Sequence, residues 1–253
     1  MRLHFQSFGS GEPLVVLHGL FGSGDNWHGF AQRFATRFRV ILPDARNHGL
    51  SPHDREMSYA VMAADVRELM AEQGIGPAHV LGHSMGGKTA MELALSVGGQ
   101  VRSLVVVDMA PRAYAPHHEH ILEALCGLEL AQYRDRRQIE EALAQAVPDL
   151  GVRRFLLKSL ARDASGGLQW KLGLEGIREN YPRLNEALAG GRAWSGSCLF
   201  VRGGSSDYVS EGDEAAITAP FPAARFCAIP GAGHWVHADA PELFETVVSN
   251  FLT

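Results

Sequence analysis

The stretch HVLGHSMGGK, at residues 79–88, decides the fold of this chain. It begins with the apolar residues of a buried strand, passes through a Gly-x-Ser-x-Gly motif centred on Ser84, and continues into a run with helical periodicity. Gly82 and Gly86 leave room for the neighbouring chain to approach closely, which a serine on a sharp strand-to-helix turn requires. This context predicts that the turn lifts the Ser84 hydroxyl above the edge of a sheet, where it can act as a nucleophile.

Strands and helices alternate on both sides of this stretch. The helical segments include residues 57–73, where Val61, Val66 and Leu69 share one face and Gly74 is a stop signal. Apolar runs of strand length occur at residues 14–17, 39–42, 79–81, 103–107, 198–201 and 225–229. Continuous apolar strands that alternate with helices are typical of a parallel sheet covered on both faces, so we predict an α/β fold with a mostly parallel central sheet.

The alternation stops between about residues 111 and 195. This region contains helix-like segments at residues 118–132, 138–146, 152–162 and 168–180, and no convincing strand. We interpret residues 112–195 as a helical cap, inserted between the sixth and seventh strands of a core domain that consists of residues 1–111 and 196–253. The alternative is that the region belongs to the core and contains strands without a recognisable pattern.

Composition and charge exclude several classes of protein. The 253 residues are 46% hydrophobic and 20% charged, an ordinary balance for a folded domain with a large core. A net charge of -5 without a run of Lys or Arg argues against nucleic acid as a partner. No segment has the roughly 20 apolar residues of a membrane span, and the first residues lack a secretory signal, so we expect a cytoplasmic protein. Cys126, Cys198 and Cys227 lack metal-ligand spacing and are expected to be free thiols.

A serine hydroxyl needs a base that removes its proton, and the best candidate among the 12 histidines is His234. His234 lies on a Gly-rich turn, at residues 230–234, after the last apolar run of strand length. A base in this late position fits the chain order of serine, acid and histidine that accompanies a turn like the one around Ser84. His237 falls at the start of the following helix, which favours a structural role.

Two backbone N–H groups are expected to bind the oxygen that becomes negative in a tetrahedral intermediate. Met85 follows Ser84 at the start of the predicted helix, where the helix dipole favours negative charge. The second donor is expected in the loop HGLFG, at residues 18–22, after an early strand. Leu20 is the first choice there and Phe21 the alternative, because the glycines let the backbone approach a substrate closely.

Three further stretches resemble a known family. HGLFGS at residues 18–23, PDARNHGLS at residues 43–51 and VDMAP at residues 107–111 are similar to segments of the small bacterial YbfF-type acyl esterases and their mitochondrial relatives, within the α/β-hydrolase superfamily. The resemblance extends over nearly the whole chain outside the cap. The stretch DARNHG, at residues 44–49, is its more specific motif, since most of the superfamily has Gly at the position of Asn47. The resemblance implies an esterase without cofactor or metal that acts on short- to medium-chain acyl esters, with acyl-CoA thioesters as a further substrate class.

The acid that orients His234 has two candidates. Asp207 follows the penultimate strand, where most of the superfamily keeps its acid, whereas Asp108 ends the preceding strand in the segment that resembles the YbfF type. Counting three positions from Gly203 places Ser206 at the superfamily position, whereas counting from Gly204 places Asp207 there. We favour Asp108, with Ser206 as a hydrogen-bonding partner of the histidine and Asp207 as the alternative acid.

Aromatic residues near these groups are candidates for an apolar acyl pocket, namely Phe21, Tyr208, Trp170 and Trp235. The expected partner is a small acyl ester or thioester, and the protein is expected to act as a monomer or homodimer. The polar loop at residues 44–48 is interpreted as a brace for the loops of the site. Carbon–carbon bond hydrolysis, elimination and cofactor-free haloperoxidation use the same groups and stay open as alternatives, as does a non-catalytic ligand receptor.

Overall fold

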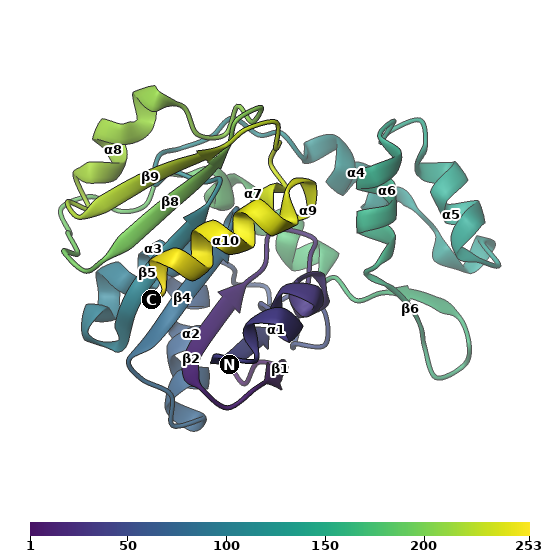
Figure 1. Cartoon of the computed structure of the whole chain (residues 1–253). Coiled ribbons are helices and arrows are strands. Elements are labelled where there is room, and N and C mark those ends of the chain that lie inside the picture. The colour runs from purple at the N-terminus through teal and green to yellow at the C-terminus, as the bar shows by residue number, and fades with distance from the viewer.

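A seven-stranded sheet forms the centre of the structure, a computed structural model that describes all 253 residues (Figure 1). The strands are β1 (Phe5–Phe8), β2 (Glu12–Leu17), β3 (Phe38–Pro43), β4 (Ala78–His83), β5 (Val101–Val107), β8 (Cys198–Gly203) and β9 (Ala224–Ile229). Their order is β1-β3-β2-β4-β5-β8-β9, and only β1 runs antiparallel to its neighbour. The prediction of a mostly parallel sheet is confirmed. The edge strand β1, whose residues are only partly buried, was not indicated by an apolar run.

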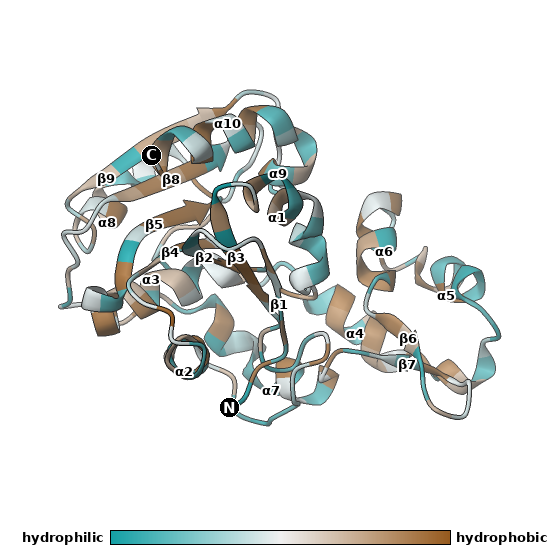
Figure 2. Cartoon of the chain, turned by 60° about the horizontal axis from the view of Figure 1, so that its bottom comes forward, coloured by the Kyte–Doolittle hydropathy of each residue, from teal (hydrophilic) through white to brown (hydrophobic).

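Helices cover both faces of the sheet, as predicted. They are α1 (His28–Phe34), α2 (Tyr59–Glu72), α3 (Met85–Val97), α8 (Glu214–Thr218), α9 (Val236–Asp239) and α10 (Pro241–Phe251), with the 3-10 turns η1 (Gly24–Trp27), η2 (Gly98–Gln100) and η4 (Glu211–Asp213). None of the helices in the chain combines the length and the hydrophobicity that a membrane crossing requires. Along β2, Val15 and Leu17 join an apolar cluster with α2, α3 and α8, whereas Leu14 and Val16 join a second cluster with α1 and α10. Alternate strand residues therefore hold different helix layers, and Figure 2 shows the apolar colouring concentrated along the strands.

Local signals set both ends of α2. The Ser58 hydroxyl accepts the Val61 N–H at 3.3 Å and thereby satisfies one of the free donors at the start of the helix. Gly74 has a φ of +61°, a left-handed conformation that glycine adopts at little cost just after a helix. The helix predicted at residues 57–73 is confirmed, with ends one or two residues inside the predicted ones.

Most residues between β5 and β8 form a separate group of elements. These are α4 (Glu119–Gly127), η3 (Leu130–Gln132), α5 (Arg136–Leu143), α6 (Leu150–Leu157), β6 (Leu160–Arg162), β7 (Leu168–Trp170) and α7 (Leu174–Asn185). Figures 1 and 2 show α4, α5, α6 and the β6–β7 hairpin extending to one side of the sheet. A third apolar cluster joins these elements to Phe21 and Met85. The group is therefore packed against the end of the sheet at which the Ser84 turn lies.

Two predictions for this region are wrong. Residues 152–162 and 168–180 were expected to form continuous helices, but each contains a short strand, because Leu160–Arg162 pairs with Leu168–Trp170 in an antiparallel hairpin. Three residues are too few for an alternating pattern to be distinguished from a helical one. The insertion also lies between the fifth and sixth strands of this sheet, since only five of them precede it, and not between the sixth and seventh.

The turn between β4 and α3 brings backbone atoms close together at the two glycines of the motif. A Cβ atom on Gly82 would lie 2.1 Å from the Gly86 carbonyl oxygen, and one on Gly86 would lie 2.3 Å from the Leu17 carbonyl oxygen. Backbone atoms cannot move aside as the end of a flexible side chain can, so this packing requires glycine at both positions.

Replacing Gly82 with alanine is expected to lower the free energy of unfolding by about 3 kcal/mol or to prevent folding, because overpacking forces the turn apart. Gly127→Ala is the matched control, since nothing lies within 4 Å of a Cβ atom at this exposed helical position. Urea unfolding of the two variants measures the difference. Equal stability of both variants would contradict the close approach at Gly82.

Candidate active site

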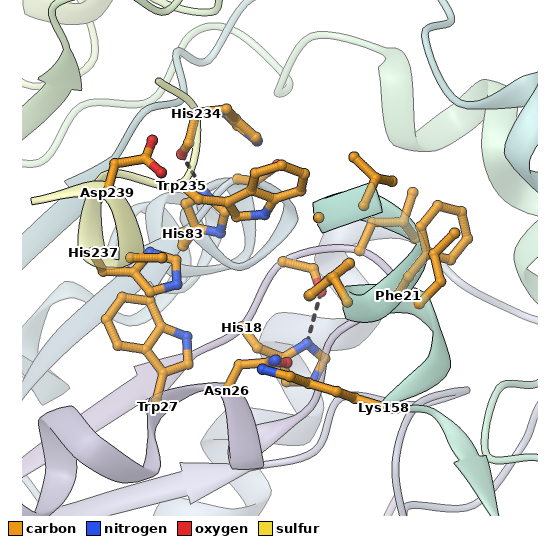
Figure 3. Close-up of a pocket in the computed structure, with 18 of the residues that line it drawn as sticks. His18, Phe21, Asn26, Trp27, His83, Lys158, His234, Trp235, His237 and Asp239 are labelled. Carbon is orange, nitrogen blue, oxygen red and sulfur yellow. Dashed lines mark hydrogen bonds between the residues drawn. The ribbon is translucent and has the colours of Figure 1, made fainter. Parts of the chain in front are cut away.

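The candidate site lies where the order of the strands reverses. β3 is on one side of β2 and β4 is on the other, so the connections that leave β2 and β4 diverge and open a crevice at their carboxyl ends. The loop at residues 18–21 follows β2, and Ser84 follows β4. Both line a cavity of about 510 Å³, which also reaches α1, α4 and α6. Figure 3 shows part of its lining, with His234 and Trp235 close to His83.

Ser84 has a backbone conformation that L-residues rarely adopt, with φ of 52° and ψ of -118°. Such a conformation costs about 1–3 kcal/mol and persists only where the surrounding structure enforces it. Its N–H donates to the Val107 carbonyl at 3.1 Å, which ties the turn to the end of β5. The residue is 8% exposed, and this exposed part faces the cavity.

His234 is oriented through its Nδ1 atom. This atom lies 2.7 Å from Oδ2 of Asp108, and because an ionised carboxylate only accepts hydrogen bonds, Nδ1 carries the proton. The other ring nitrogen, Nε2, then has a free lone pair. A free lone pair on Nε2 is what a general base for a serine hydroxyl needs.

Two further contacts hold the His234 loop. The His234 ring stacks on the Tyr208 ring, with 3.7 Å between centroids and 19° between planes. The His83 Nε2–H donates to the His234 carbonyl at 2.9 Å. Burial lowers the pKa of His83 well below its ordinary value, so this ring stays neutral and keeps the tautomer that donates at Nε2. His234 is thus fixed by its ring and by its backbone.

The Asp108 carboxylate has no exposed surface and three hydrogen-bond donors around it. Besides His234, the Ser206 hydroxyl donates to Oδ2 at 2.5 Å, and the Gly203 N–H donates to Oδ1 at 3.0 Å. Asp108 itself has a φ of +51°, another left-handed conformation, directly after the end of β5. Ser206 was expected to form a hydrogen bond with His234, and this is wrong. Its hydroxyl donates instead to the Asp108 carboxylate, so it contacts the residue that orients His234.

Asp207 lies outside this network. It is exposed, and its side chain makes no hydrogen bond within the chain. Its neighbours on either side face inward, since the Ser206 hydroxyl contacts Asp108 and the Tyr208 ring stacks on His234. Of the two candidate acids, the structure therefore brings Asp108 to His234 and leaves Asp207 in solvent.

Ser84 and His234 line the same cavity, although they lie far apart in the sequence. No hydrogen bond joins the Ser84 hydroxyl to the His234 ring in the structure. Hydrogen bonds between catalytic groups are often long or poorly aligned without substrate and shorten when substrate binds. The candidate nucleophile and base therefore share one water-accessible space, which a substrate can enter.

The two residues expected to supply oxyanion donors, Leu20 and Met85, line the cavities beside Ser84. Met85 is the first residue of α3, whose N–H groups have no partner within the helix. The Leu20 N–H donates no hydrogen bond within the chain. In contrast, the Phe21 N–H donates to Nε2 of His48 at 3.1 Å, so the alternative donor proposed from the sequence is already engaged. Leu20 and Met85 are left as the pair that can bind a developing oxyanion.

Two buried histidines bind the loops of the site to each other. His18 Nδ1–H donates to the Gly19 carbonyl, and its Nε2 accepts the Ala45 N–H at 2.9 Å. His48 Nδ1–H donates to the Arg46 carbonyl, and its Nε2 accepts the N–H of Phe21. Each loop therefore supplies a histidine that accepts from the other loop. The polar loop at residues 44–48 thus contacts the loop at residues 18–22 in the way expected of a brace.

The aromatic residues expected around a pocket fall into different places. Phe21 and Trp235 line the larger cavity. Tyr208 lines a second cavity, of about 40 Å³, which also contacts Ser84. Trp170 lines neither cavity, so its expected place in the pocket is wrong. It belongs to the β6–β7 hairpin and packs against the third apolar cluster, because that strand lies away from the Ser84 turn.

His118 is a residue of the site that sequence reasoning missed. It lies just before α4 and lines both cavities beside Ser84. Burial lowers its pKa to about 4, and its ring makes an edge-to-face contact with Phe21 in the loop at residues 18–22. The only signal was the histidine-rich run HHEH at residues 117–120.

No set of three or more His, Cys, Asp or Glu side chains is grouped so that it could hold a metal ion.

Residues 12–151, more than half of the chain, match the family described as the α/β hydrolase fold. This range includes β2, the Ser84 turn, β5 and part of the region between β5 and β8. The matched segment therefore contains the candidate nucleophile, both candidate oxyanion donors and Asp108.

Several characterised proteins are similar over nearly the whole chain. Esterase YbfF of Escherichia coli strain K12 is 36% identical over 95% of this chain and 92% of its own length. The sn-1-specific diacylglycerol lipase ABHD11 of Mus musculus is 37% identical over 94% of this chain and 80% of its own length. Among solved structures, a marine microorganism esterase is 38% identical, with a TM-score of 0.96 over 99% of both chains.

Three histidines of the site, one buried and two half-buried, predict that the protein loses stability at acidic pH. Burial lowers the pKa of His48 to about 3, of His237 to about 3 and of His118 to about 4, whereas an unfolded histidine titrates near 6.5. As the pH falls below 6.5, the unfolded chain binds protons that the folded chain does not, so the free energy of unfolding decreases. Each histidine contributes at most about 1.4 kcal/mol per pH unit.

Urea unfolding at pH 7 and pH 5 measures this effect, and the expected loss is about 3 kcal/mol or more. His48→Gln removes one of the titrating rings, so its loss over the same interval is expected to be smaller than that of the unchanged protein. A free energy of unfolding that is constant from pH 7 to pH 5 would contradict the neutral state of these rings.

Proposed function

The chain belongs to the α/β-hydrolase family and is a serine ester hydrolase, and we propose that it cleaves short- to medium-chain carboxylic esters through an acyl-enzyme on Ser84. One observation carries this proposal. The His234 ring, oriented by the buried Asp108 carboxylate at 2.7 Å, lines the same cavity as the Ser84 hydroxyl. That arrangement supplies a nucleophile, a base and an acid in their required order.

In the proposed first half of the reaction, His234 Nε2 takes the proton of the Ser84 hydroxyl as its oxygen attacks the ester carbonyl carbon. The negative carbonyl oxygen is bound by the N–H groups of Leu20 and Met85. The ester C–O bond then breaks, and the imidazolium gives its proton to the leaving alkoxide. In the second half, water takes the place of the alcohol and attacks the carbonyl carbon of the acyl-enzyme while His234 takes its proton. The carboxylic acid product leaves, and the imidazolium returns the proton to Ser84.

Asp108 keeps the proton of the neutral imidazole on Nδ1 and stabilises the imidazolium that forms during the reaction. The Ser206 hydroxyl and the Gly203 N–H support this role, since they keep the carboxylate in one orientation. Ser206 and Gly203 are positioning groups here, and Asp207 has no part in the proposed mechanism.

We also propose a division into two domains, a second substrate class and a cellular location. Residues 112–195 are proposed as a cap domain over a core of residues 1–111 and 196–253, which the wall that α4 and α6 supply to the larger cavity supports. Thioesters present the same carbonyl carbon to Ser84 and are a proposed second substrate class. A cytoplasmic location is supported by three cysteines that form no disulfide.

The nucleophile is tested by Ser84→Ala, which is expected to lower kcat for p-nitrophenyl acetate by at least about 10⁴-fold, because the acyl-enzyme cannot form. Ser165→Ala, at an exposed turn of the β6–β7 hairpin, is the matched control and keeps full activity. A fluorophosphonate probe followed by mass spectrometry is expected to modify Ser84 in the control. Modification of another residue, or turnover by Ser84→Ala, would overturn the proposal.

The acid is tested by the pair Asp108→Asn and Asp207→Asn. The first is expected to lower kcat by about 10³- to 10⁴-fold, because asparagine does not hold the imidazole in the tautomer that accepts a proton. The second is expected to change kcat by less than about twofold, as for other exposed sites. Circular dichroism checks that both variants fold. If only Asp207→Asn loses activity, Asp207 and not Asp108 is the acid that orients His234.

A further inference from the structure

Ser84 lies between two cavities of very different size. The larger one has a volume of about 510 Å³ and the smaller one of about 40 Å³. Only three residues line both of them, namely Ser84, Leu20 and His118. A substrate carbonyl held at Ser84 and Leu20 therefore has two directions open to its two substituents, and the groups around each cavity decide which substituent enters which.

His234 fixes the direction of the alcohol. The leaving oxygen must come within hydrogen-bond reach of Nε2, because this atom returns the proton taken from Ser84. His234 lines the larger cavity and not the smaller one. The alcohol part of the ester must therefore extend into the larger cavity.

The oxyanion donors fix the direction of the acyl group. Met85 lines the smaller cavity and not the larger one, and Leu20 lines both. The two residues that supply the proposed oxyanion donors therefore both border the smaller cavity. With the nucleophile, the oxyanion and the leaving oxygen assigned, the fourth substituent of the tetrahedral carbon is the acyl chain, and the smaller cavity is the space left for it.

We propose that the cavity of about 40 Å³ is the acyl site and limits this enzyme to acyl groups of about two to four carbons, while the larger cavity binds alcohols of much greater size. This inference rests on the proposed function of Ser84 and narrows the acyl range of that site from short and medium chains to short ones. A single water needs about 10–15 Å³ of such volume, so the smaller cavity holds a chain of only a few heavy atoms.

Hydrogen bonds make the walls of the acyl site rigid. The Tyr59 hydroxyl donates to the Leu184 carbonyl at 2.7 Å, and the Tyr114 hydroxyl donates to the Tyr208 carbonyl at 2.9 Å. The Tyr181 hydroxyl accepts the backbone N–H groups of His117 and His118, just before α4. Each of these hydroxyls would lose a hydrogen-bond partner if its ring moved, so widening the cavity for a longer chain costs free energy.

Two apolar side chains, Leu184 from α7 and Met109 after β5, complete the wall. Leu184 is buried, and its carbonyl, not its side chain, binds Tyr59. Its side chain can therefore be shortened without removing a hydrogen bond. Leu184 is accordingly the position at which the length of the acyl site can be changed.

The test measures kcat/KM for p-nitrophenyl esters of acetate, propionate, butyrate, hexanoate, octanoate and dodecanoate, so that only the acyl chain varies. The intact protein is expected to accept the first three and to lose at least about tenfold by octanoate, the size of effect that one or two methylenes without space produce. Acetate esters of increasingly long alcohols are expected to show no such limit. A kcat/KM that rises toward octanoate or dodecanoate would overturn the proposal.

Leu184→Ala is expected to raise the ratio of kcat/KM for hexanoate to that for acetate by about tenfold. Ile121→Ala is the matched control, because Ile121 is an equally buried cap residue that lines only the larger cavity, and its ratio is expected to stay unchanged. Leu184→Val, a smaller truncation, replaces the alanine variant if thermal unfolding shows that the latter is not folded. An unchanged ratio in a folded Leu184 variant, or an equal shift in the control, would overturn the assignment.

The fluorophosphonate probe separates this inference from the proposed function. If Ser84 is modified but long acyl chains are preferred, the acyl-site assignment is wrong and the nucleophile is retained. If Ser84 is not modified, the proposed function itself fails.

Discussion

The geometry of the site depends on one contact, the 2.7 Å hydrogen bond between His234 Nδ1 and the Asp108 carboxylate. A carboxylate without exposed surface is costly unless its oxygens are hydrogen-bonded, and here the ring, the Ser206 hydroxyl and the Gly203 N–H all donate to it. These donors come from the last residue of β8 and from the loops after β8 and β9. The charge at the end of β5 therefore organises the two later loops and fixes the tautomer of the imidazole.

The parallel sheet explains how residues from five separate segments meet. Strands β2, β4, β5, β8 and β9 run in one direction, so their carboxyl ends lie along one edge of the sheet. The connections that leave β2 and β4 diverge, because the strand order changes direction there, and this opens the edge at Ser84. The neutral rings of His18 and His48 join the loop after β2 to the loop after β3 beside this opening. The elements between β5 and β8 then divide the space above Ser84 into a large and a small cavity.

The sequence predicts what depends on local pattern and misses what depends on packing. The sheet, its covering helices and the Ser84 turn follow from apolar periodicity and from glycines without space for a Cβ atom. For the acid, the sequence favours Asp108 over Asp207 only through a register count and a family resemblance, because both follow neighbouring parallel strands. The structure shows which side chain turns inward. The hairpin that contains Trp170 was missed because its strands have three residues each. The site role of His118 depends on how α4 packs over Ser84, which no motif signals.

The protonation of the His234 ring tests the central contact most directly, and nitrogen NMR of protein labelled with ¹⁵N-histidine measures it. The proton is expected on Nδ1, in Asp207→Ala as in the unchanged protein. In Asp108→Ala the loss of the acceptor is expected to shift the proton to Nε2 or to distribute it over both nitrogens. Ring signals that respond to Asp207→Ala and not to Asp108→Ala would contradict the assignment of the buried carboxylate as the group that orients the imidazole.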